Sequence, residues 1–208
     1  NLCDLKDLGY YKSIGLIIIY FFFYNIKFFK LECMKKPNIM KKYLFLIVFA
    51  IGAFAGIAQE KDEVVTTYYL IRHAEKNRAV KGDKDPFLTI KGAKRAGHWA
   101  EVLSNANINM VYTTNYNRTK ETAQPTAAKN GLRLYVYDPR KMYDEGFKYN
   151  TRGKNVLIVG HSNTTNVFAN KILGKDKYKE IEDDNNSNLY IVTVTKSGAT
   201  SVLLKIDH

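Results

Sequence analysis

Residues 64–76 of the chain read VVTTYYLIRHAEK. The first eight of these residues are β-branched, aromatic or aliphatic, and such a run predicts a buried strand. The strand leads directly into Arg72 and His73. A second apolar run, NVLIV at residues 155–159, leads in the same way, after one glycine, into His161. Two buried strands that are each followed by a histidine are the pattern from which the fold can be predicted.

Helical patterns separate the predicted strands along the sequence. Thr89 offers an N-cap to a helix that continues to Leu103, and Asn117 offers a cap to a second helix that ends near Asn130, with Gly131 as its stop. Further strands are predicted at residues 110–114, 132–137, 189–194 and 201–206, and further helices at residues 141–149 and 165–173. Strands that alternate with helices imply parallel βαβ units. The predicted fold is therefore one α/β domain, a three-layer sandwich with a mostly parallel central sheet.

Composition and charge limit the class of protein. The 208 residues are 46% hydrophobic and carry a formal net charge of +12, which allows one ordinary domain with an appendage and excludes a disordered chain. Only two cysteines occur, Cys3 and Cys33, so a disulfide scaffold is excluded and a Cys-based metal site nearly so. Residues 59–208 hold 24 Lys and Arg against 17 Asp and Glu, a net charge of +7. Their lysines are scattered, which favours small anionic ligands and does not indicate nucleic acid.

The first 39 residues differ in character from the rest. They contain nine aromatic residues and begin with Asn1 rather than Met. Their apolar run is short for a transmembrane helix, which needs about 20 such residues. We interpret residues 1–39 as upstream sequence translated from too early a start, or as a disordered segment. A membrane anchor is the alternative.

From Met40 the sequence has the layout of a secretory signal peptide. Two lysines follow Met40, an apolar stretch spans residues 43–57, and small residues close it. Cleavage after Ala58 is preferred, cleavage after Ala55 competes with it, and an uncleaved N-terminal anchor is the alternative. The expected product is an exported domain of residues 59–208, periplasmic or extracellular. It would have no cysteine and no stable membrane span, which suits an oxidising compartment.

Histidine and arginine side chains gather at the predicted strand ends. His73 and His161 each follow a strand, and Arg118 lies at the start of the helix after the strand at 110–114. Because ligands of open α/β sheets bind beyond the carboxyl ends of the strands, we expect these residues to lie together with Arg72. Arginine side chains and a helix N-terminus bind phosphate oxygens, and a histidine beside them can attack phosphorus. The cluster predicts phosphoryl transfer that needs no metal.

The motifs LIRHAEK, TTNYNRTKETA and GHSNTT resemble those of the histidine phosphatase superfamily, whose members have a phosphoglycerate mutase-like fold. The resemblance spans about residues 66–194 and includes the segment LTIKGAKRAGHWAEVL. It implies that His73 forms a phosphohistidine intermediate. It also implies that Arg72, Arg118 and His161 bind the transferring phosphoryl group. The resemblance further implies that no metal or organic cofactor is needed, and that the partner is a small phosphorylated substrate or a phosphopeptide.

Family members also supply a carboxylic general acid, and its identity here is open. Phytase-like members have Asp directly after the second histidine, where this chain has Ser162. Mutase-like members have Glu after the second arginine motif, and the options in that segment are Glu121, Asp138, Asp144 and Glu145. We prefer Asp144 and Glu145 because that section usually carries specificity. Because a general acid contributes about 10²–10⁴-fold, a site without one would favour good leaving groups such as those of phosphoramidates.

The length of the chain favours hydrolysis over a mutase reaction. Only 42 residues separate Arg118 from His161, too few for the large helical cap of phytase-like members, so the pocket is expected to be open. A mutase must shield its phosphorylated intermediate from water, and export also argues against it. A non-catalytic module that binds phosphorylated ligands is the other alternative. Glu75, Lys76 and Asn163 adjoin the motifs and are possible site residues.

Overall fold

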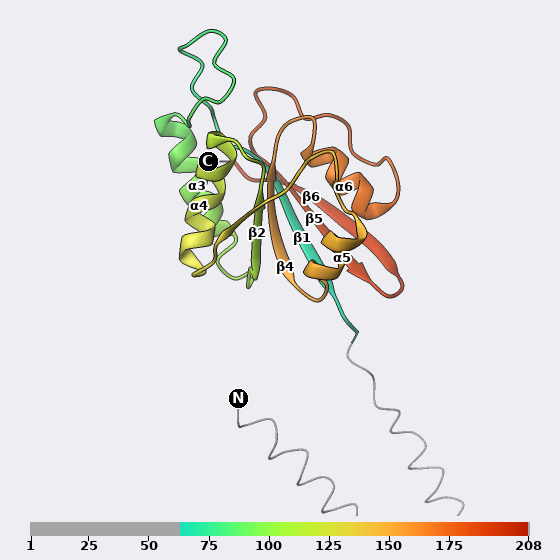
Figure 1. The fold of residues 1–208 in the computed structure, drawn as a ribbon. Coiled ribbons are helices and arrows are strands. Elements are labelled where there is room, and N and C mark those ends of the chain that lie inside the picture. The colour runs from blue at the N-terminus through green and yellow to red at the C-terminus, as the bar shows by residue number, and fades with distance from the viewer. Residues whose placement is uncertain (1–62, 208) are drawn as a thin grey trace, which may run out of the picture. The chain divides into compact units, whose positions relative to one another are not determined.

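The computed structural model describes residues 63–207, in which a mixed six-stranded sheet lies between two layers of helices (Figure 1). The strands are β1 (Thr66–Arg72), β2 (Met110–Thr113), β3 (Leu134–Val136), β4 (Asn155–Gly160), β5 (Asn188–Thr195) and β6 (Gly198–Lys205). The helices are α3 (Ile90–Val102), α4 (Asn117–Lys129), α5 (Glu145–Thr151) and α6 (Thr165–Leu173). This arrangement confirms the predicted three-layer α/β sandwich.

The order of the strands places three motif ends side by side. The sheet runs β3-β2-β4-β1-β5-β6, and its first four strands are parallel. Across β1 and β4, Arg72 pairs with Gly160, so both strands end at the same level. Strands β5 and β6 are antiparallel to β1, and β5 begins at the same edge because Leu189 pairs with Ile71. The segment before β5 is therefore carried to the carboxyl edge of the parallel strands.

Apolar side chains pack on both faces of the sheet and fix its position against the helices. On one face Phe147 of α5 and Phe168 of α6 pack with Tyr68 of β1. On the other face the fully buried Trp99 of α3 packs in a cluster with Ile71. Each large side chain that is fully buried stabilises the fold by about 1.5–3 kcal/mol. The strand ends are thus held by a packed core on both sides.

Most elements lie where the sequence predicts them, with small shifts at their ends. Helix α6 has the predicted bounds, and Thr89 caps α3 as expected. The helix predicted at 141–149 begins later, at Glu145, because the carboxylate of Asp144 caps it by accepting a hydrogen bond from the Phe147 amide. Asn117 is the first residue of α4 and not its cap; the N-cap position is Tyr116, which gives no side-chain hydrogen bond. That prediction was wrong.

The proposed signal peptide at 40–58, its cleavage points and the aromatic segment at 1–39 lie outside the described residues. Within residues 63–207 no helix has the length and apolar character that crossing a membrane requires.

Candidate active site

The neighbouring parallel strands bring the two motif histidines together. His73 and His161 each stand one residue past the paired ends of β1 and β4. The amide of His73 donates to the carbonyl of Gly160 at 2.9 Å, and the two imidazole centroids are 5.4 Å apart. Arg118 joins them from the first turn of α4, with Nη2 3.4 Å from Nδ1 of His161. The structure therefore places Arg118 and both histidines in one cluster with Arg72, as the sequence predicts for a phosphoryl site.

Two glycines allow the close backbone approach that this cluster requires. A Cβ atom at Gly160 would lie 2.8 Å from Thr165 Oγ1 and 3.0 Å from Tyr137 Oη, which is too close for an ordinary contact. A Cβ atom at Gly92, in the first turn of α3, would collide with the backbone carbonyl of Glu75. The loop after β1 thus lies directly on α3, and the turn after β4 lies directly on α6.

His73 is held as a neutral imidazole with a free Nε2. Its Nδ1 lies 2.8 Å from the carbonyl oxygen of Ala74, which can only accept, so Nδ1 carries the proton and the lone pair is on Nε2. His73 is only 3% exposed. Burial, together with the charges of Arg72, His161 and Arg118, lowers the pKa of His73 to about 3. At neutral pH the ring is therefore in the form that can attack an electrophile.

The tautomer of His161 follows from its two neighbours. Its Nδ1 faces Nη2 of Arg118, which can only donate, so Nδ1 is the acceptor. Its Nε2 then carries the proton and donates to Oγ1 of Thr114, 2.9 Å away. Thr114 is buried, and its hydroxyl also lies 3.0 Å from Oγ1 of Thr119. Burial, with the charge of Arg118, lowers the pKa of His161 to about 4.

Arg72 is buried, and a loop before β5 occupies its donors. Its Nη1 donates to the carbonyl oxygens of Glu182 at 2.8 Å and Asn185 at 3.1 Å. Its Nη2 donates to Asp183 Oδ1 at 2.7 Å, and the other oxygen of this carboxylate lies 2.6 Å from Nη2 of Arg78. Its Nε is buried without a hydrogen-bond partner among the described residues. The carboxylate of Asp183 thus pairs with the guanidinium of Arg72, which the sequence predicts to bind the phosphoryl group.

Arg118 is held by longer contacts. Its Nη1 lies 3.3 Å from the carbonyl oxygen of Lys84 and 3.7 Å from Oδ1 of Asp85. Its guanidinium carbon lies 4.4 Å from the centre of the Tyr116 ring. Asp85 also accepts a hydrogen bond from the Asn117 amide at 2.7 Å, so one of the α4 amides that the sequence offers to an anion already has a partner.

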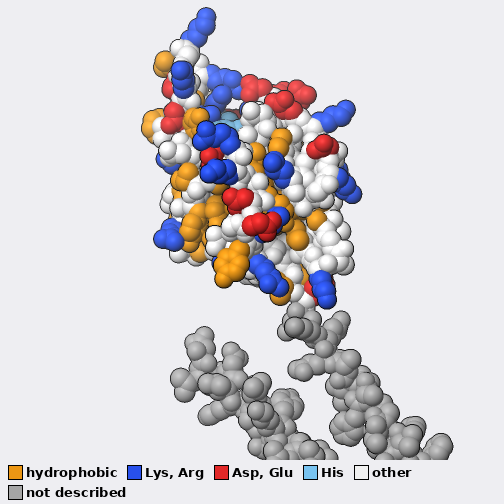
Figure 2. Space-filling model, turned by 45° about the vertical axis from the view of Figure 1, so that its right-hand side comes forward, with side chains coloured by type: hydrophobic (Ala, Val, Ile, Leu, Met, Phe, Trp, Pro, Cys, Tyr) orange, Lys and Arg blue, Asp and Glu red, His pale blue; other side chains and the backbone are white. Residues whose placement is uncertain are grey.

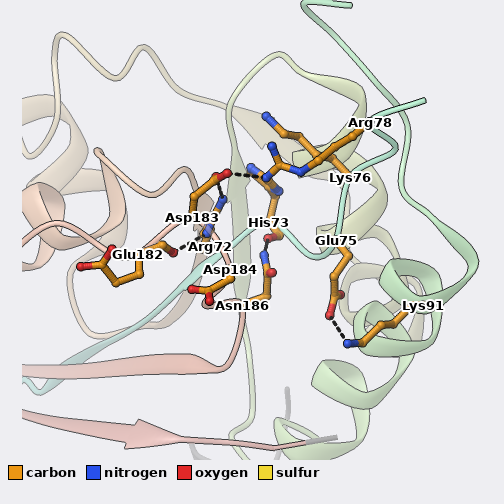
Figure 3. Close-up of a pocket in the computed structure, with 10 residues that line it drawn as sticks. All are labelled: Arg72, His73, Glu75, Lys76, Arg78, Lys91, Glu182, Asp183, Asp184 and Asn186. Atoms are coloured by element: carbon orange, nitrogen blue, oxygen red, sulfur yellow. Dashed lines mark hydrogen bonds and ion pairs between the residues drawn. The ribbon is translucent and has the colours of Figure 1, made fainter. Parts of the chain in front are cut away.

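A cavity of about 650 Å³ opens beside Arg72 and His73 (Figure 3). Its lining is polar or charged throughout: Arg72, His73, Glu75, Lys76, Arg78, Lys91, Glu182, Asp183, Asp184 and Asn186. In the space-filling view of one face, a histidine is visible close to basic and acidic side chains (Figure 2). The side-chain nitrogen Nδ2 of Asn186 donates to the backbone carbonyl of His73 at 2.7 Å, so the loop before β5 also holds the backbone of His73. Within residues 63–207 no group of three metal-binding side chains is found.

The three possible site residues have different positions. Glu75 lines the cavity, but its carboxylate is paired with the buried Arg95, whose Nε lies 3.0 Å from both oxygens. Lys76 also lines the cavity. Asn163 is exposed in the turn before α6 and is not part of the lining.

The preferred general acids do not lie at the cluster. The carboxylate of Asp144 is used as the cap of α5, and Glu145 is exposed and pairs with Lys148 at 2.7 Å. Helix α5 ends only four residues before β4 begins, so it lies by the amino ends of the strands, away from the histidines (Figure 1). The other two options are also engaged elsewhere: Glu121 accepts from the Leu88 amide, and Asp138 pairs with Arg140.

Sequence reasoning missed the loop before β5. Asp183 and Asn186 contact Arg72 and His73, yet the run EIEDDNN at residues 180–186 has the composition of a solvated loop. The signal that could have found them is the pairing of β5 with β1, because an antiparallel neighbour must begin where β1 ends. The sequence also gave no reason to single out Asp85.

The fold is phosphoglycerate mutase-like, and the cluster of arginine and histidine resembles that of the histidine phosphatase superfamily. The family model described as the histidine phosphatase superfamily (branch 1) matches residues 68–140, which confirms the resemblance seen in the motifs. A search of curated proteins gave no match.

Solved structures of phosphatases share the fold. A putative phosphohistidine phosphatase SixA from Agrobacterium tumefaciens matches with 19% identity and a TM-score of 0.50, covering 68% of this chain and 99% of that chain. A protein histidine phosphatase SixA in complex with tungstate matches with 16% identity and a TM-score of 0.55, covering 67% and 96%. A mycobacterial glucosyl-3-phosphoglycerate phosphatase matches with 12% identity and a TM-score of 0.55, covering 68% and 99%. At these identities the likeness establishes the fold and not the substrate.

Proposed function

We propose that the domain hydrolyses phosphomonoesters or phosphoramidates through a phosphohistidine intermediate on His73. The observation that carries this proposal is the hydrogen bond from Nδ1 of His73 to the carbonyl of Ala74. It leaves Nε2 as the only basic nitrogen of a buried, neutral imidazole. Arg118 lies beside this imidazole and supplies donors for the oxygens of a phosphoryl group, and His161 positions Arg118 by accepting from its Nη2.

In the first step Nε2 of His73 attacks phosphorus, and the bond from phosphorus to the leaving oxygen or nitrogen breaks. The phosphorylated ring then carries positive charge on its Nδ1–H side, which the carbonyl of Ala74 stabilises. In the second step a water molecule attacks phosphorus and the Nε2–P bond breaks. Phosphate and a neutral His73 are the products. No metal ion takes part in either step, so we expect activity to be unchanged in EDTA.

Two of the four carboxyls in the cavity lining cannot act as the general acid for the leaving group. Glu75 and Asp183 line the cavity, but their arginine partners lower the pKa of each carboxyl, and burial only partly opposes this. Both are therefore ionised at neutral pH and cannot donate a proton. This favours substrates whose leaving group departs readily, and phosphohistidine is one.

Hydrolysis suits this site better than a mutase reaction. Asp183, which lies on Arg72, is 67% exposed, so water reaches the place where the phosphoryl group would sit. A mutase would lose its phosphorylated intermediate to this water. A non-catalytic module that only binds phosphorylated ligands is the alternative, and it would need no nucleophile.

The test is His73→Asn, whose amide nitrogen can replace Nδ1–H in the hydrogen bond to Ala74 but offers no nucleophile. We expect turnover of p-nitrophenyl phosphate to fall by about 10³-fold or more. Wild-type protein quenched in base during turnover should hold an acid-labile phosphoryl group, and the variant should hold none. Wild-type turnover no faster than that of His73→Asn would overturn the enzyme proposal and leave the binding module.

We also propose that the domain acts outside the cytoplasm, because a signal-peptide layout precedes it at residues 40–58. Mass spectrometry of the N-terminus of the protein from its native source tests this. We expect a chain that begins at residue 59 or 56. A chain that begins at residue 40 in the cytosol would overturn it.

A further inference from the structure

The cavity is much larger than a phosphoryl group, so it has room for a further part of the substrate. At about 650 Å³ it extends from Arg72 and His73 as far as Lys91 on α3. Every side chain of its lining ends in a polar or charged group, and the ring among them is the imidazole of His73. The part of the substrate that leaves therefore meets groups that can form ionic contacts and hydrogen bonds.

Lys76 is the cation of this lining that lacks an acidic partner. Within residues 63–207 no carboxylate oxygen lies within the 4.0 Å of an ion pair from its ammonium group, whereas Lys91 has Glu75 at 3.6 Å and Arg78 has Asp183 at 2.6 Å. Partial burial of Lys76 and the charges of Arg78 and Arg118 lower the pKa of this ammonium group, and the charge of Asp183 opposes them only in part. A lysine in this position gains from an anion at ion-pair distance, and among the described residues Asp183 does not come that close.

The pairing of Arg78 with Asp183 shows that a carboxylate fits in the part of the cavity where Lys76 lies. Nη2 of Arg78 and that of Arg72 contact the two oxygens of one carboxylate, that of Asp183, at 2.6 Å and 2.7 Å. Two guanidinium groups thus converge on one anionic group at the mouth of the cavity. Asp183 comes from an exposed position on the loop before β5, so a substrate anion can compete with it for these donors.

We propose that Lys76 and Arg78 form a subsite for a second anionic group on the substrate, a carboxylate or a phosphate carried by the leaving group. The inference rests on the proposed hydrolysis at His73, because that reaction fixes where the first anionic group lies. The subsite would select substrates with two anionic groups over those with one.

The acidic residues of the lining do not cancel this subsite. Glu75 is engaged by Arg95 and Asp183 by two arginines, so their charges already have partners. Figure 3 shows Glu182 and Asp184 on the side of His73 opposite to Lys76. The basic side of the cavity is therefore the one nearer to Lys76 and Arg78.

Binding of a matched pair of phosphonates to the full chain tests the inference. The ligands are 3-carboxyphenylphosphonate and 3-carbamoylphenylphosphonate, which have nearly the same shape and differ by one negative charge. We expect the carboxylate to bind the wild type about tenfold more tightly at low salt, as one charged hydrogen bond allows. Lys76→Met should reduce this ratio to about two or less. Lys94→Met, which removes an exposed charge from α3 outside the lining, should leave it unchanged.

The outcomes separate the subsite from the reaction. A ratio near one in the wild type, or a tenfold ratio kept in Lys76→Met, overturns the subsite. The corresponding phenyl phosphates then report on catalysis: if His73-dependent hydrolysis occurs at the same kcat/KM for both esters, the proposed function stands and the subsite fails. If neither ester is hydrolysed but the phosphonate ratio depends on Lys76, the subsite stands on a protein that binds without turnover.

Discussion

The two arginines of the cluster are held in opposite ways. Arg72 is 3% exposed and donates three hydrogen bonds of 2.7–3.1 Å to the loop before β5. Arg118 makes contacts of 3.3–3.7 Å to Lys84, Asp85 and His161. The first guanidinium is fixed by short hydrogen bonds to its loop, whereas the second is held by longer contacts although its side chain is only 12% exposed.

This difference teaches that one cluster can contain both a structural arginine and a binding arginine. Short, charge-assisted hydrogen bonds from a buried guanidinium fix the loop as much as the loop fixes the guanidinium. Long contacts leave more of the hydrogen-bonding capacity of an arginine for a substrate. The Arg72 side therefore contributes to stability and substrate binding together, and the Arg118 side contributes mainly to substrate binding.

The largest expected effects come from removing each guanidinium in turn. Arg118→Gln should lower kcat/KM for p-nitrophenyl phosphate by about 10²–10³-fold, because an oxygen of the transferring group loses its charged donor. Its free energy of unfolding should change by less than about 1 kcal/mol, since the lost contacts are long. Arg72→Gln should lower activity by a similar factor and stability by about 2–3 kcal/mol, because three short, charge-assisted hydrogen bonds from a buried side chain are lost.

Urea unfolding beside steady-state kinetics checks this pair. Equal losses of stability in the two variants would contradict the contrast between the arginines. Lys94→Gln is a suitable control for the removal of one positive charge, because Lys94 is exposed and lies outside the cavity lining.

The next effect is a dependence of stability on pH that both histidines produce. The pKa of His73 is lowered from 6.5 to about 3 and that of His161 to about 4, so between these values and 6.5 the unfolded chain binds more protons. Stability is therefore full above pH 6.5 and falls as the pH falls toward 4. His73 alone should remove about 2 kcal/mol between pH 6.5 and pH 5. The contribution of His73 to the free energy of unfolding should keep falling to a lower pH than the contribution of His161.

Urea unfolding at several pH values in His73→Asn and His161→Gln measures this. Each variant should show a smaller loss of stability between pH 6.5 and pH 5 than the wild type. If His73→Asn loses as much as the wild type over this range, the imidazole is not held neutral by burial.

The sequence predicts the Arg118 side of the cluster better than the Arg72 side. A strand that ends before a helix start places Arg118 by local rules alone, and the parallel pairing of β1 with β4 then follows from the αβ alternation. The contacts of Arg72 depend on Asp183, 111 positions away, and on the antiparallel pairing of β5. No local pattern in an acidic loop shows which buried cation it meets.

The predicted general acids show the same limit. Asp144 and Glu145 lie in the expected segment, and propensity alone allows a helix there from residue 141. The carboxylate of Asp144 instead becomes the cap, which sets the start of α5 and leaves both carboxyls by the amino ends of the strands. The spacing of Asp144 and Glu145 in the sequence does not show which of them becomes the cap.

A smaller effect tests whether the carboxylate of Asp183 competes with an anionic ligand for Arg72. In Asp183→Asn the loop keeps its backbone contacts from Glu182 and Asn185 to Arg72, but the competing charge is gone. Inorganic phosphate should then inhibit about threefold more strongly at low salt, and the difference should shrink at high salt. Stability should fall by less than about 1 kcal/mol because Asp183 is mostly exposed. Weaker inhibition by phosphate in Asp183→Asn would show that this carboxylate supports the arginines rather than competing with the ligand.

The smallest effect is expected for a substitution in α5, which lies away from both Arg72 and Arg118. Glu145 is 89% exposed and its partner is Lys148, three residues along the same helix. Glu145→Gln should therefore change kcat for p-nitrophenyl phosphate by less than about twofold, because a surface pair of this kind contributes little and the carboxyl does not reach the cluster. Turnover of an alkyl phosphate, whose leaving oxygen needs a proton more than a phenol does, is the sharper measurement. A selective loss of alkyl phosphate turnover in Glu145→Gln would mean that α5 moves to the cluster during the reaction, and neither arginine region would then describe the whole site.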